Sequence, residues 1–334
     1  PCAVVVTCLF YGAISGSGPA TVAAIGAMSI PLLVSLGYDK TFVTALVATA
    51  GGLGVIIPPS IPFILYGLSS GVSVGAMFIA GILPGLLIGF CLMAYACYYC
   101  WKHGEDKEKL AAYCYELRKN GLWHIFSKSF WALMTPVIIL GGIYGGVTTP
   151  TEAACVSVVY AIIVCCFVYK TMTFKDVVSA FVEAVVTYGP ITFILAGAMA
   201  FGRVLTIMQA PQTIAMMITG LVSSKIAILI VINLFLLVVG MVIDTSPAIL
   251  ILTPILLPLV KQIGVDPIHF GIIMVVNLAI GFVTPPMGIN LFVASSMTGI
   301  SVVTIARKAI PFIVAFLISL LLITFIPAIS LALL

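Results

Sequence analysis

Long, unbroken apolar runs dominate the chain. The runs at 72–100 and 310–326 are each long enough to cross a hydrocarbon core of about 30 Å as a helix. A membrane β-barrel would instead show short segments in which apolar and polar residues alternate. The pattern therefore predicts an all-α polytopic membrane protein. The expected helices lie at about 72–101, 130–147, 152–170, 188–208 and 303–330.

Two polar breaks interrupt the apolar pattern. The larger, 101–128, carries six of the chain's 14 Lys and Arg residues, and the smaller runs from Lys170 to Asp176. The stretches 116–128 and 174–187 are amphipathic, so we expect them to lie along the membrane surface. The helix expected at 152–170 is preceded by Thr149-Pro150-Thr151-Glu152, which predicts a capping box rather than a binding role for Glu152.

The composition supports a lipid environment. Hydrophobic residues make up 63% of the chain and charged residues only 7%, with a mean hydropathy of +1.31. A soluble domain carries about 25% charged residues. The net charge is +4, but the basic residues do not gather on one compact domain, so no nucleic-acid partner is expected. The nine cysteines lie mostly in apolar runs and predict no disulfide framework, and the three histidines lie in no metal-ligand spacing.

A duplication organises the chain. Each copy contains two apolar arms joined by a small polar tip, followed by a helix that a Pro-Pro pair interrupts in its middle. From the Gly-x-Asp turns onward, the matched residues stand 227 positions apart. The matched pairs are Ser17-Gly18-Pro19-Ala20 with Thr245-Ser246-Pro247-Ala248, Gly37 with Gly264, Asp39 with Asp266, Gly54 with Gly281, Pro58-Pro59 with Pro285-Pro286, and Pro84 with Pro311. Two short arms with a polar tip predict a re-entrant hairpin in each copy.

The distribution of basic residues predicts that the two copies are inverted. If the break at 101–128 is cytoplasmic, counting the hairpins as re-entrant places 11 of the 14 Lys and Arg residues on that side. Lys225 and Lys261 fall on the opposite side, and Arg203 lies within a span. The first hairpin then enters from the cytoplasm and the second from the opposite face.

Interrupted helices within lipid point to a transport function. Their unpaired backbone groups survive in a membrane only where they line a cavity or an ion site. Carbonyls at the end of a first arm, together with Ser and Thr hydroxyls, offer hard oxygen ligands suited to Na⁺. The arms that begin at Pro19 and Pro247 direct positive dipole ends toward the same region, which favours an anionic carboxylate. A secondary transporter with alternating access is the predicted class.

Two charged residues lie inside apolar runs. Asp244, on the second tip, is either part of an ion site or a helix cap. Arg203 either faces the substrate path or extends from a helix end to the interface. The simplest alternative is that the Pro-Pro pairs only kink long helices for packing. A packing kink would explain one break. It would not explain why a polar tip accompanies a break in both copies.

Five motifs resemble the large membrane subunit of TRAP (tripartite ATP-independent periplasmic) transporters over essentially the whole chain. They are residues 12–22 (GAISGSGPATV), 57–60 (IPPS), 140–146 (LGGIYGG), 149–154 (TPTEAA) and 284–288 (TPPMG). The resemblance implies an ion-transporter-superfamily fold and Na⁺-coupled symport of organic-acid anions, such as C4-dicarboxylates or sialic acids, by an elevator-type movement. It also implies a periplasmic substrate-binding protein and a small membrane subunit as partners, location in the bacterial inner membrane, and no cofactor beyond the coupling ion.

The resemblance also implies a division of the chain into segments. Residues 1–71 and 225–300 would be the two halves of a transport domain. Residues 72–187, with the cytoplasmic loop 101–128, would form scaffold helices and amphipathic arms, 188–224 a connecting region, and 301–334 a C-terminal scaffold helix. The family has further helices before the first hairpin, and this chain begins directly in an apolar segment.

Site residues follow from the matched motifs. One Na⁺ site would use Ser15, Ser17, Gly18, Gly54, Ile57 and Pro58. The second would use Thr245, Ser246, Gly281, Thr284 and Pro285, with Asp244 added as the charged residue of that tip. The anion would lie between the tips near Pro59, Ser60 and Asn290, with Arg203 as a further candidate.

Two other functions remain open at this point. A stand-alone Na⁺/dicarboxylate symporter of the same superfamily would need no binding protein. An intramembrane enzyme would have to use Asp244 with Arg203 or the Cys97-Tyr98-Tyr99-Cys100 pair, but no second carboxylate or nucleophile-base pair accompanies Asp244.

Overall fold

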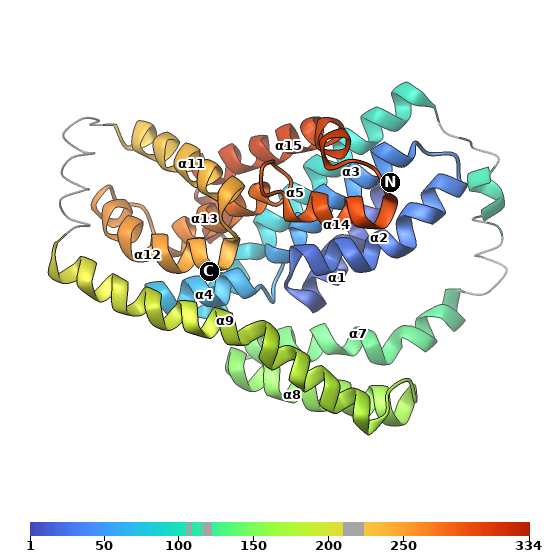
Figure 1. The fold of residues 1–334 in the computed structure, drawn as a ribbon, viewed down its shortest axis with the longest axis horizontal. Coiled ribbons are helices and arrows are strands. Elements are labelled where there is room, and N and C mark those ends of the chain that lie inside the picture. The colour runs from blue at the N-terminus through green and yellow to red at the C-terminus, as the bar shows by residue number, and fades with distance from the viewer. Residues whose placement is uncertain (105, 107–108, 114, 116–121, 210–223) are drawn as a thin grey trace. The chain divides into compact units, whose positions relative to one another are not determined.

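The computed structural model describes residues 1–104, 106, 109–113, 115, 122–209 and 224–334. Every regular element in these described residues is a helix (Figure 1), and eight of the helices are long and apolar enough to cross a membrane. The all-α prediction is confirmed. The elements are α1 (Cys2–Ser15), α2 (Gly18–Ser35), α3 (Lys40–Ala50), η1 (Gly51–Val55), α4 (Ile61–Ser70), α5 (Val74–His103), α7 (Leu122–Tyr144), α8 (Pro150–Ile163), η2 (Val164–Val168), α9 (Phe174–Ile207), α11 (Lys225–Val242), α12 (Thr245–Gln262), α13 (Pro267–Gly281), α14 (Ile289–Thr298), α15 (Val302–Phe325) and α16 (Ala328–Leu331).

The chain forms two compact units. Unit 1 contains residues 1–105 and 195–334, and therefore both predicted repeats, whereas unit 2 contains residues 106–194. In unit 2, α7 and α8 pack antiparallel. The hydroxyl of Tyr160 donates to the Trp131 carbonyl at 2.8 Å, and the hydroxyl of Tyr169 donates to the Lys128 carbonyl at 2.6 Å.

Helix α8 begins with the predicted capping box. The Thr149 hydroxyl accepts a hydrogen bond from the Glu152 N–H at 3.3 Å, and the Glu152 carboxylate accepts one from the Thr149 N–H at 2.8 Å. Glu152 therefore stabilises the helix start, as the sequence indicates.

Three of the expected helices have different bounds in the structure. Helix α7 already includes residues 122–129, which lie before the expected start at 130, and α15 ends at Phe325 rather than at 330. The third difference concerns α9. The sequence suggests an amphipathic surface segment at 174–187 followed by a separate helix at 188–208, but α9 is continuous over its 34 residues. Pro190 lies inside α9 and does not end it. A proline removes one backbone donor, and a long helix tolerates this loss with a bend rather than a break. The other segment expected at the surface, 116–128, lies partly outside the described residues and partly in α7.

Two helical hairpins, α1–α2 and α11–α12, stand at the predicted polar tips. Two residues join α1 to α2, and two join α11 to α12. Length alone would allow α2, α11 and α12 to cross a membrane. However, the first tip ends against the middle of a broken helix, since a Cβ placed on Gly54 would lie 2.8 Å from the Ser17 carbonyl oxygen. The first hairpin tip therefore lies against the break of its own repeat.

Each hairpin is followed by an interrupted helix, as predicted. Helix α3 continues into the 3-10 turn η1, and helical geometry resumes only at α4, while α13 ends at Gly281 and α14 begins at Ile289. Both breaks contain a cis Pro-Pro peptide bond, at Pro58-Pro59 and Pro285-Pro286. The carboxylates of Asp39 and Asp266 accept N–H groups in the first turns of α3 and α13 and cap these helices in the same way.

The two interrupted helices run in opposite directions. The Tyr66 hydroxyl donates to the Pro267 carbonyl at 2.6 Å and so joins the end of α4 to the start of α13. The Lys40 ammonium donates to the Thr298 carbonyl at 2.8 Å and so joins the start of α3 to the end of α14. Because the start of each interrupted helix meets the end of the other, the two repeats are inverted, as the charge distribution predicts.

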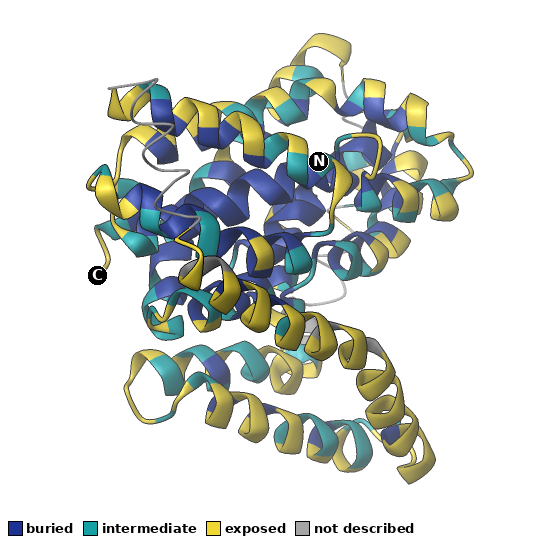
Figure 2. Cartoon of the chain, turned by 60° about the vertical axis from the view of Figure 1, so that its left-hand side comes forward, coloured by how far each residue is buried: buried dark blue, intermediate teal, exposed yellow. Residues whose placement is uncertain are grey.

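The repeats interlock around a buried centre. Helix α4 packs on α12, and α14 packs on α2, so the second half of each interrupted helix lies against the hairpin of the other repeat (Figure 1). Residues 42–50 of α3 and 269–281 of α13 are buried without exception and form the dark-blue interior of unit 1 in Figure 2. Helices that are apolar on all sides belong in such a core.

The helix starts correct the pairing of the two tips by one residue. The second arms begin at Gly18 and Thr245, which are 227 positions apart, and not at Pro19 and Pro247. Ser17 and Asp244, the residues before the two helices, are both extended. A helix begins at the residue after such an extended cap, and proline fits anywhere in the first turn, so the prolines need not align.

Close backbone packing predicts that Gly281→Ala destabilises unit 1. A Cβ on Gly281 would overlap the carbonyl oxygen of Gly240 in α11, and a helix backbone cannot move aside as a flexible side chain can. Overpacking a core costs about 1–3 kcal/mol. We expect a lower yield of folded protein in detergent and a lower unfolding temperature.

The matched control is Gly197→Ala. Gly197 is an exposed helical glycine in α9, and a Cβ there meets nothing within 4 Å. Its unfolding temperature should equal that of the wild type. Equal stability of the two variants would contradict the close contact between α11 and α13.

Candidate functional site

The first tip holds a compact group of oxygen atoms. The Thr21 hydroxyl donates to the Ser17 carbonyl at 2.8 Å. The Ser15 hydroxyl lies 3.3 Å from the same carbonyl oxygen and 3.1 Å from the Thr21 hydroxyl. These three oxygens come from the end of α1, the link and the first turn of α2, so the hairpin itself brings them together.

The spacing of these oxygens fits a hard cation. Oxygen ligands at about 2.4 Å from an ion and at right angles to one another stand about 3.4 Å apart. The oxygens of Ser15, Ser17 and Thr21 are 2.8–3.3 Å apart, with no carboxylate among them. A set of neutral oxygens of this kind suits a monovalent cation better than a divalent one, because no ligand charge offsets the second positive charge.

The first break lies directly against this tip. A Cβ on Gly54 would collide with the Thr21 hydroxyl, and a Cβ on Gly16 would lie 2.7 Å from the Pro59 carbonyl oxygen. Gly16 has φ of +62°, the left-handed conformation that glycine adopts most readily. Because Gly16 and Gly54 have no side chain, the tip and the break can approach each other closely at the carbonyls of Ser17 and Pro59. The structure therefore brings Ser15, Ser17 and Gly54 together.

The other first-site candidates have separate surroundings. Ile57 and Pro58 lie in the break, where the Ile57 side chain packs against Gly85 of α5. Gly18 opens α2 but faces the second repeat, because a Cβ there would lie 3.1 Å from the Phe282 ring.

The second tip repeats the arrangement with different side chains. Gly281 packs against the Gly240 backbone, as Gly54 packs against Gly12 in the first repeat. The Met287 N–H donates to the Met241 carbonyl at 2.9 Å and fastens the second break to the end of α11. The tip and the break of the second repeat are therefore in direct contact, as in the first.

Thr245 carries the most distinctive atom of this tip. It is the first residue of α12 and is 2% exposed, yet its hydroxyl oxygen has no hydrogen-bond partner in the described chain. Buried hydroxyls are normally paired, and an unpaired one costs about 1–3 kcal/mol. Ser246 follows Thr245 in α12, and Thr284 and Pro285 lie in the facing break, where the Thr284 hydroxyl donates to the Ile280 carbonyl at 2.8 Å.

Asp244 stands at the N-cap position of α12, but its side chain makes no capping hydrogen bond. The equivalent residue Ser17 makes none either. Of the two roles that the sequence leaves open for Asp244, the described contacts lend no support to capping, and its carboxylate remains a candidate ion ligand.

Asn290 connects the two repeats. It is fully buried, and its side-chain amide donates to the Ala48 carbonyl of α3 at 3.0 Å, while its own N–H donates to the Phe282 carbonyl at 3.0 Å. Its side-chain oxygen has no hydrogen-bond partner in the described chain, and a Cβ on Gly18 would lie 3.4 Å from it. Asn290 thus offers an unpaired acceptor beside the start of α2.

Ser60 has a structural role in this conformation. It is fully buried, its hydroxyl donates to the Val55 carbonyl, and the same oxygen accepts the Phe63 N–H at 3.3 Å as the cap of α4. Among the described residues, no hydrogen bond joins Ser60 to Asn290, although both follow a break. Pro59 contributes its carbonyl to the region beside Gly16.

Arg203 lies away from the tips. It lines a cavity of ≈ 390 Å³ with residues of α4, α9 and α12, among them Ser69, Leu250 and Pro254. No described contact links Arg203 to Asn290 or Ser60. The sequence alone does not separate this position from one between the tips, because nothing in a single apolar run reveals which helix faces it.

Thr21 and Phe282 are the residues that sequence reasoning missed. Thr21 follows Ser17 by four positions, and a threonine at this spacing commonly bonds the carbonyl one helical turn before it. That spacing was a usable signal. Phe282 lies within 3.1 Å of a Cβ on Gly18, a contact across the two repeats that no local pattern predicts.

Two inverted modules, each with an oxygen-lined tip packed against an interrupted helix, define a secondary transporter by architecture. Residues 1–329 match the family described as the tripartite ATP-independent periplasmic transporter, DctM component. The chain belongs to this family, which confirms the resemblance seen in the sequence. It is a multi-pass protein of the inner membrane.

Several characterised relatives are similar to the chain. An isethionate TRAP transporter permease protein, DctMQ, of Oleidesulfovibrio alaskensis is 49% identical over 97% of this chain and 50% of its own length. A C4-dicarboxylate TRAP transporter large permease protein of Pseudomonas aeruginosa is 44% identical over 99% of this chain and 76% of its own. A 2,3-diketo-L-gulonate TRAP transporter large permease protein of Escherichia coli is 36% identical over 97% and 75%.

The relatives bear on the alternative that the chain is an intramembrane enzyme. All of them named above are transporter permease subunits, so the chain is not an enzyme. The chain spans half the length of the first of these relatives and about three quarters of the other two.

The hydrogen bond from Asn290 to Ala48 predicts that Asn290→Leu lowers the stability of the folded protein. Leucine has a similar volume but loses the hydrogen bond to Ala48, a bond worth about 0.5–1.5 kcal/mol. We expect a small drop in unfolding temperature in detergent. The control is Ser296→Ala on the same helix, where an exposed hydroxyl bonds only its own helix. A wild-type unfolding temperature for Asn290→Leu would show that the bridge does not stabilise the interlocked repeats.

Proposed function

We propose that the permease containing this chain couples Na⁺ entry to the uptake of a small organic-acid anion. The observation that carries the proposal is the pair of tips, one in each inverted repeat, that place oxygen atoms beside a break in the backbone. Na⁺ and anion would occupy one region reached alternately from each face of the membrane.

The Na⁺ ligands of the first site would be the oxygens of Ser15, Ser17 and Thr21 with carbonyls of the first break. Their separations of 2.8–3.3 Å suit neighbouring ligands of one ion. The second site would use the unpaired Thr245 hydroxyl, with Asp244 and the second break. A bound cation would give the Thr245 oxygen the partner that it lacks in the described chain.

The anion would lie between the two tips. Both second arms, α2 and α12, begin there, and the first N–H groups of a helix favour a negative group. The Asn290 amide lies beside the start of α2. The positive charge opposite the anion would come from the helix starts and from the bound Na⁺.

The names of the relatives support a proposal for the class of cargo. Their names specify isethionate, C4-dicarboxylates and 2,3-diketo-L-gulonate, all small anions that carry a carboxylate or a sulfonate. We propose a small anion of this kind. Sialic acids, the other class that the family resemblance implies, stay a prediction that the same uptake assay can test.

Transport would use a moving body and a fixed one. The interlocked hairpins and interrupted helices would travel together as the transport domain of an elevator. A periplasmic binding protein would deliver the anion, and a small membrane subunit would complete the permease. The stand-alone symporter is the alternative, and uptake that continues without any binding protein would favour it.

The test is uptake by the complete permease in proteoliposomes under an imposed Na⁺ gradient, with its cognate binding protein present. Thr21→Val and Thr245→Val remove one candidate ligand each and keep the side-chain shape. A lost ligand worth about 1–3 kcal/mol corresponds to a roughly 5- to 150-fold rise in the Na⁺ concentration for half-maximal uptake.

The matched controls restore the hydroxyl. Thr21→Ser and Thr245→Ser keep the oxygen and should keep the Na⁺ dependence within about two-fold of the wild type. Isethionate, succinate and a sialic acid are compared as cargo. Uptake that ignores the Na⁺ gradient, or valine variants with unchanged Na⁺ dependence, would refute the proposed coupling.

A further inference from the structure

A basic cavity lies in unit 1 where α5 ends and α15 begins. Its volume is ≈ 280 Å³, equal to the share of about nine water molecules at about 30 Å³ each. The side chains of Lys102, Arg307 and Lys308 line it, together with His103, three tyrosines and Pro311. None of the described residues that line the cavity is acidic. Such a group of cations is unusual in a chain with only 7% charged residues.

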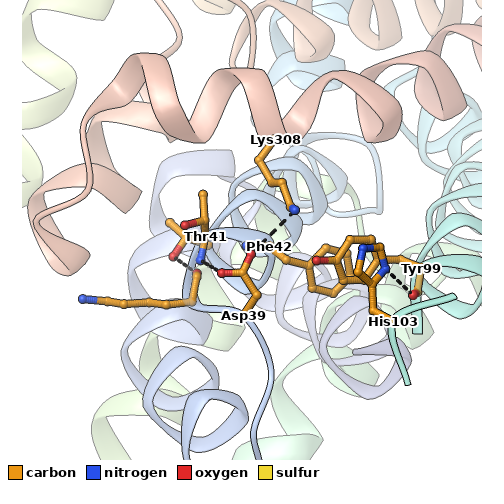
Figure 3. A network of polar contacts seen from close by, with 8 residues as sticks. Asp39, Thr41, Phe42, Tyr99, His103 and Lys308 are labelled. Atoms are coloured by element: carbon orange, nitrogen blue, oxygen red, sulfur yellow. Dashed lines mark hydrogen bonds and ion pairs between the residues drawn. The ribbon is translucent and has the colours of Figure 1, made fainter. Parts of the chain in front are cut away.

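Only one of these cations has a carboxylate partner in the described chain. Lys308 lies 3.7 Å from the carboxylate of Asp39 and 4.9 Å from the centre of the Tyr99 ring (Figure 3). The same Asp39 carboxylate also caps α3. Among the described residues, neither Lys102 nor Arg307 forms an ion pair. Like charges at close range repel unless an anion lies between them, so the cavity favours a negatively charged occupant.

The aromatic wall of the cavity is held by the core. The Tyr99 ring stacks on Phe42 at 3.7 Å and on His103 at 4.0 Å, and the His103 ring nitrogen Nδ1 lies 3.0 Å from the Tyr99 carbonyl (Figure 3). The Tyr95 ring meets Phe312 edge-on at 4.7 Å. Phe42 and Phe312 are fully buried. The wall is therefore ordered before anything binds, which lowers the entropic cost of binding.

The end of α5 that lines the cavity has the residues of a membrane interface. Tyr98 and Trp101, in the last two turns of α5, are 54% and 83% exposed, and exposed aromatic rings at the end of an apolar helix are typical of the membrane interface. By the positive-inside rule, the excess of Lys and Arg at this end predicts that it faces the cytoplasm. We propose that the cavity binds the phosphodiester headgroup of an anionic phospholipid of the cytoplasmic leaflet.

The contacts of such a headgroup follow from the lining. Lys102 and Arg307 supply charge-assisted hydrogen bonds to the phosphodiester oxygens, and the tyrosine hydroxyls supply further donors. Lys308 remains paired with Asp39 and attracts the phosphodiester through its positive charge without a direct hydrogen bond. The acyl chains lie outside, along the exposed faces of α5 and α15, where Phe90 and Ile310 are 66% and 55% exposed.

A cavity at the opposite end of unit 1 has a different balance of charge among its described lining residues. A cavity of ≈ 680 Å³ there contains a single ammonium, that of Lys225, which donates to the Gly264 carbonyl at 2.8 Å. The carboxylate of Asp266 lines the same cavity. Its charges are balanced, so excess positive charge is not a general property of the helix ends. Lys225 provides the matched control.

The test is lipid binding by the purified permease that contains this chain, followed by native mass spectrometry in detergent. Phosphatidylglycerol, zwitterionic phosphatidylethanolamine and inorganic phosphate are the three probes. The wild type should bind phosphatidylglycerol at least ten-fold more tightly than phosphatidylethanolamine. The double variant Lys102→Gln/Arg307→Gln should weaken phosphatidylglycerol binding roughly 30-fold, from about one factor of five for each charge near the surface.

Control variants test whether the loss of binding comes from the charges that line this cavity. Lys225→Gln should bind phosphatidylglycerol like the wild type, and Arg307→Lys, which keeps the charge, should bind within about three-fold of it. Arg307→Gln alone serves if the double variant does not fold, with a roughly five-fold loss expected. Equal binding of both lipids, or an unchanged affinity in the glutamine variants, would overturn the proposal. Displacement of the lipid by millimolar inorganic phosphate would assign the cavity to a free anion instead.

Discussion

The interrupted backbone of the two central helices is the constraint on which the rest of the structure depends. Every N–H or carbonyl left unpaired in lipid costs several kcal/mol, so a break within the membrane must be covered by protein. Cover comes from the hairpin of the same repeat, where Gly12 meets Gly54 and Gly240 meets Gly281 backbone against backbone. It also comes from the other repeat, since α14 packs on α2 and α4 packs on α12. Small residues make this approach possible, as in other helix contacts within membranes.

Some buried polar atoms have no hydrogen-bond partner in the described chain, and two of them lie at the candidate site. The Thr245 hydroxyl and the Asn290 side-chain oxygen are buried and unpaired in the described chain, and both lie where a tip faces a break. In most proteins a buried polar atom has a hydrogen-bond partner. The first tip differs because Ser15, Ser17 and Thr21 satisfy one another. The two ion sites that we propose are therefore not equivalent, although the helices around them are related by the repeat.

Local signals in the sequence predicted the elements better than the contacts between them. Polar tips, Pro-Pro pairs and Gly-x-Asp turns mark places where the backbone must leave the helix, so the hairpins, the breaks and the inversion were all predictable. Pro190 was misleading because a long helix absorbs one proline. Asn290 was expected near the anion, but its bond to Ala48 joins residues 242 positions apart, and no short-range pattern encodes such a contact. The position of Arg203 was open for the same reason, because the apolar run around it does not show which helices it faces.

The interlocking of the repeats imposes an order on biosynthesis. Helix α2 leaves the ribosome 227 residues before its counterpart α12, and α14, the helix that covers α2, is made later still. At about 5–20 residues per second, the first hairpin waits roughly 14–54 s for Asn290. During this interval the first break lacks the contacts that α14 and Asn290 make with the first repeat in the finished fold. The first hairpin is therefore made well before the helices that pack on it. The first repeat can reach its final packing only after the second repeat has been synthesised.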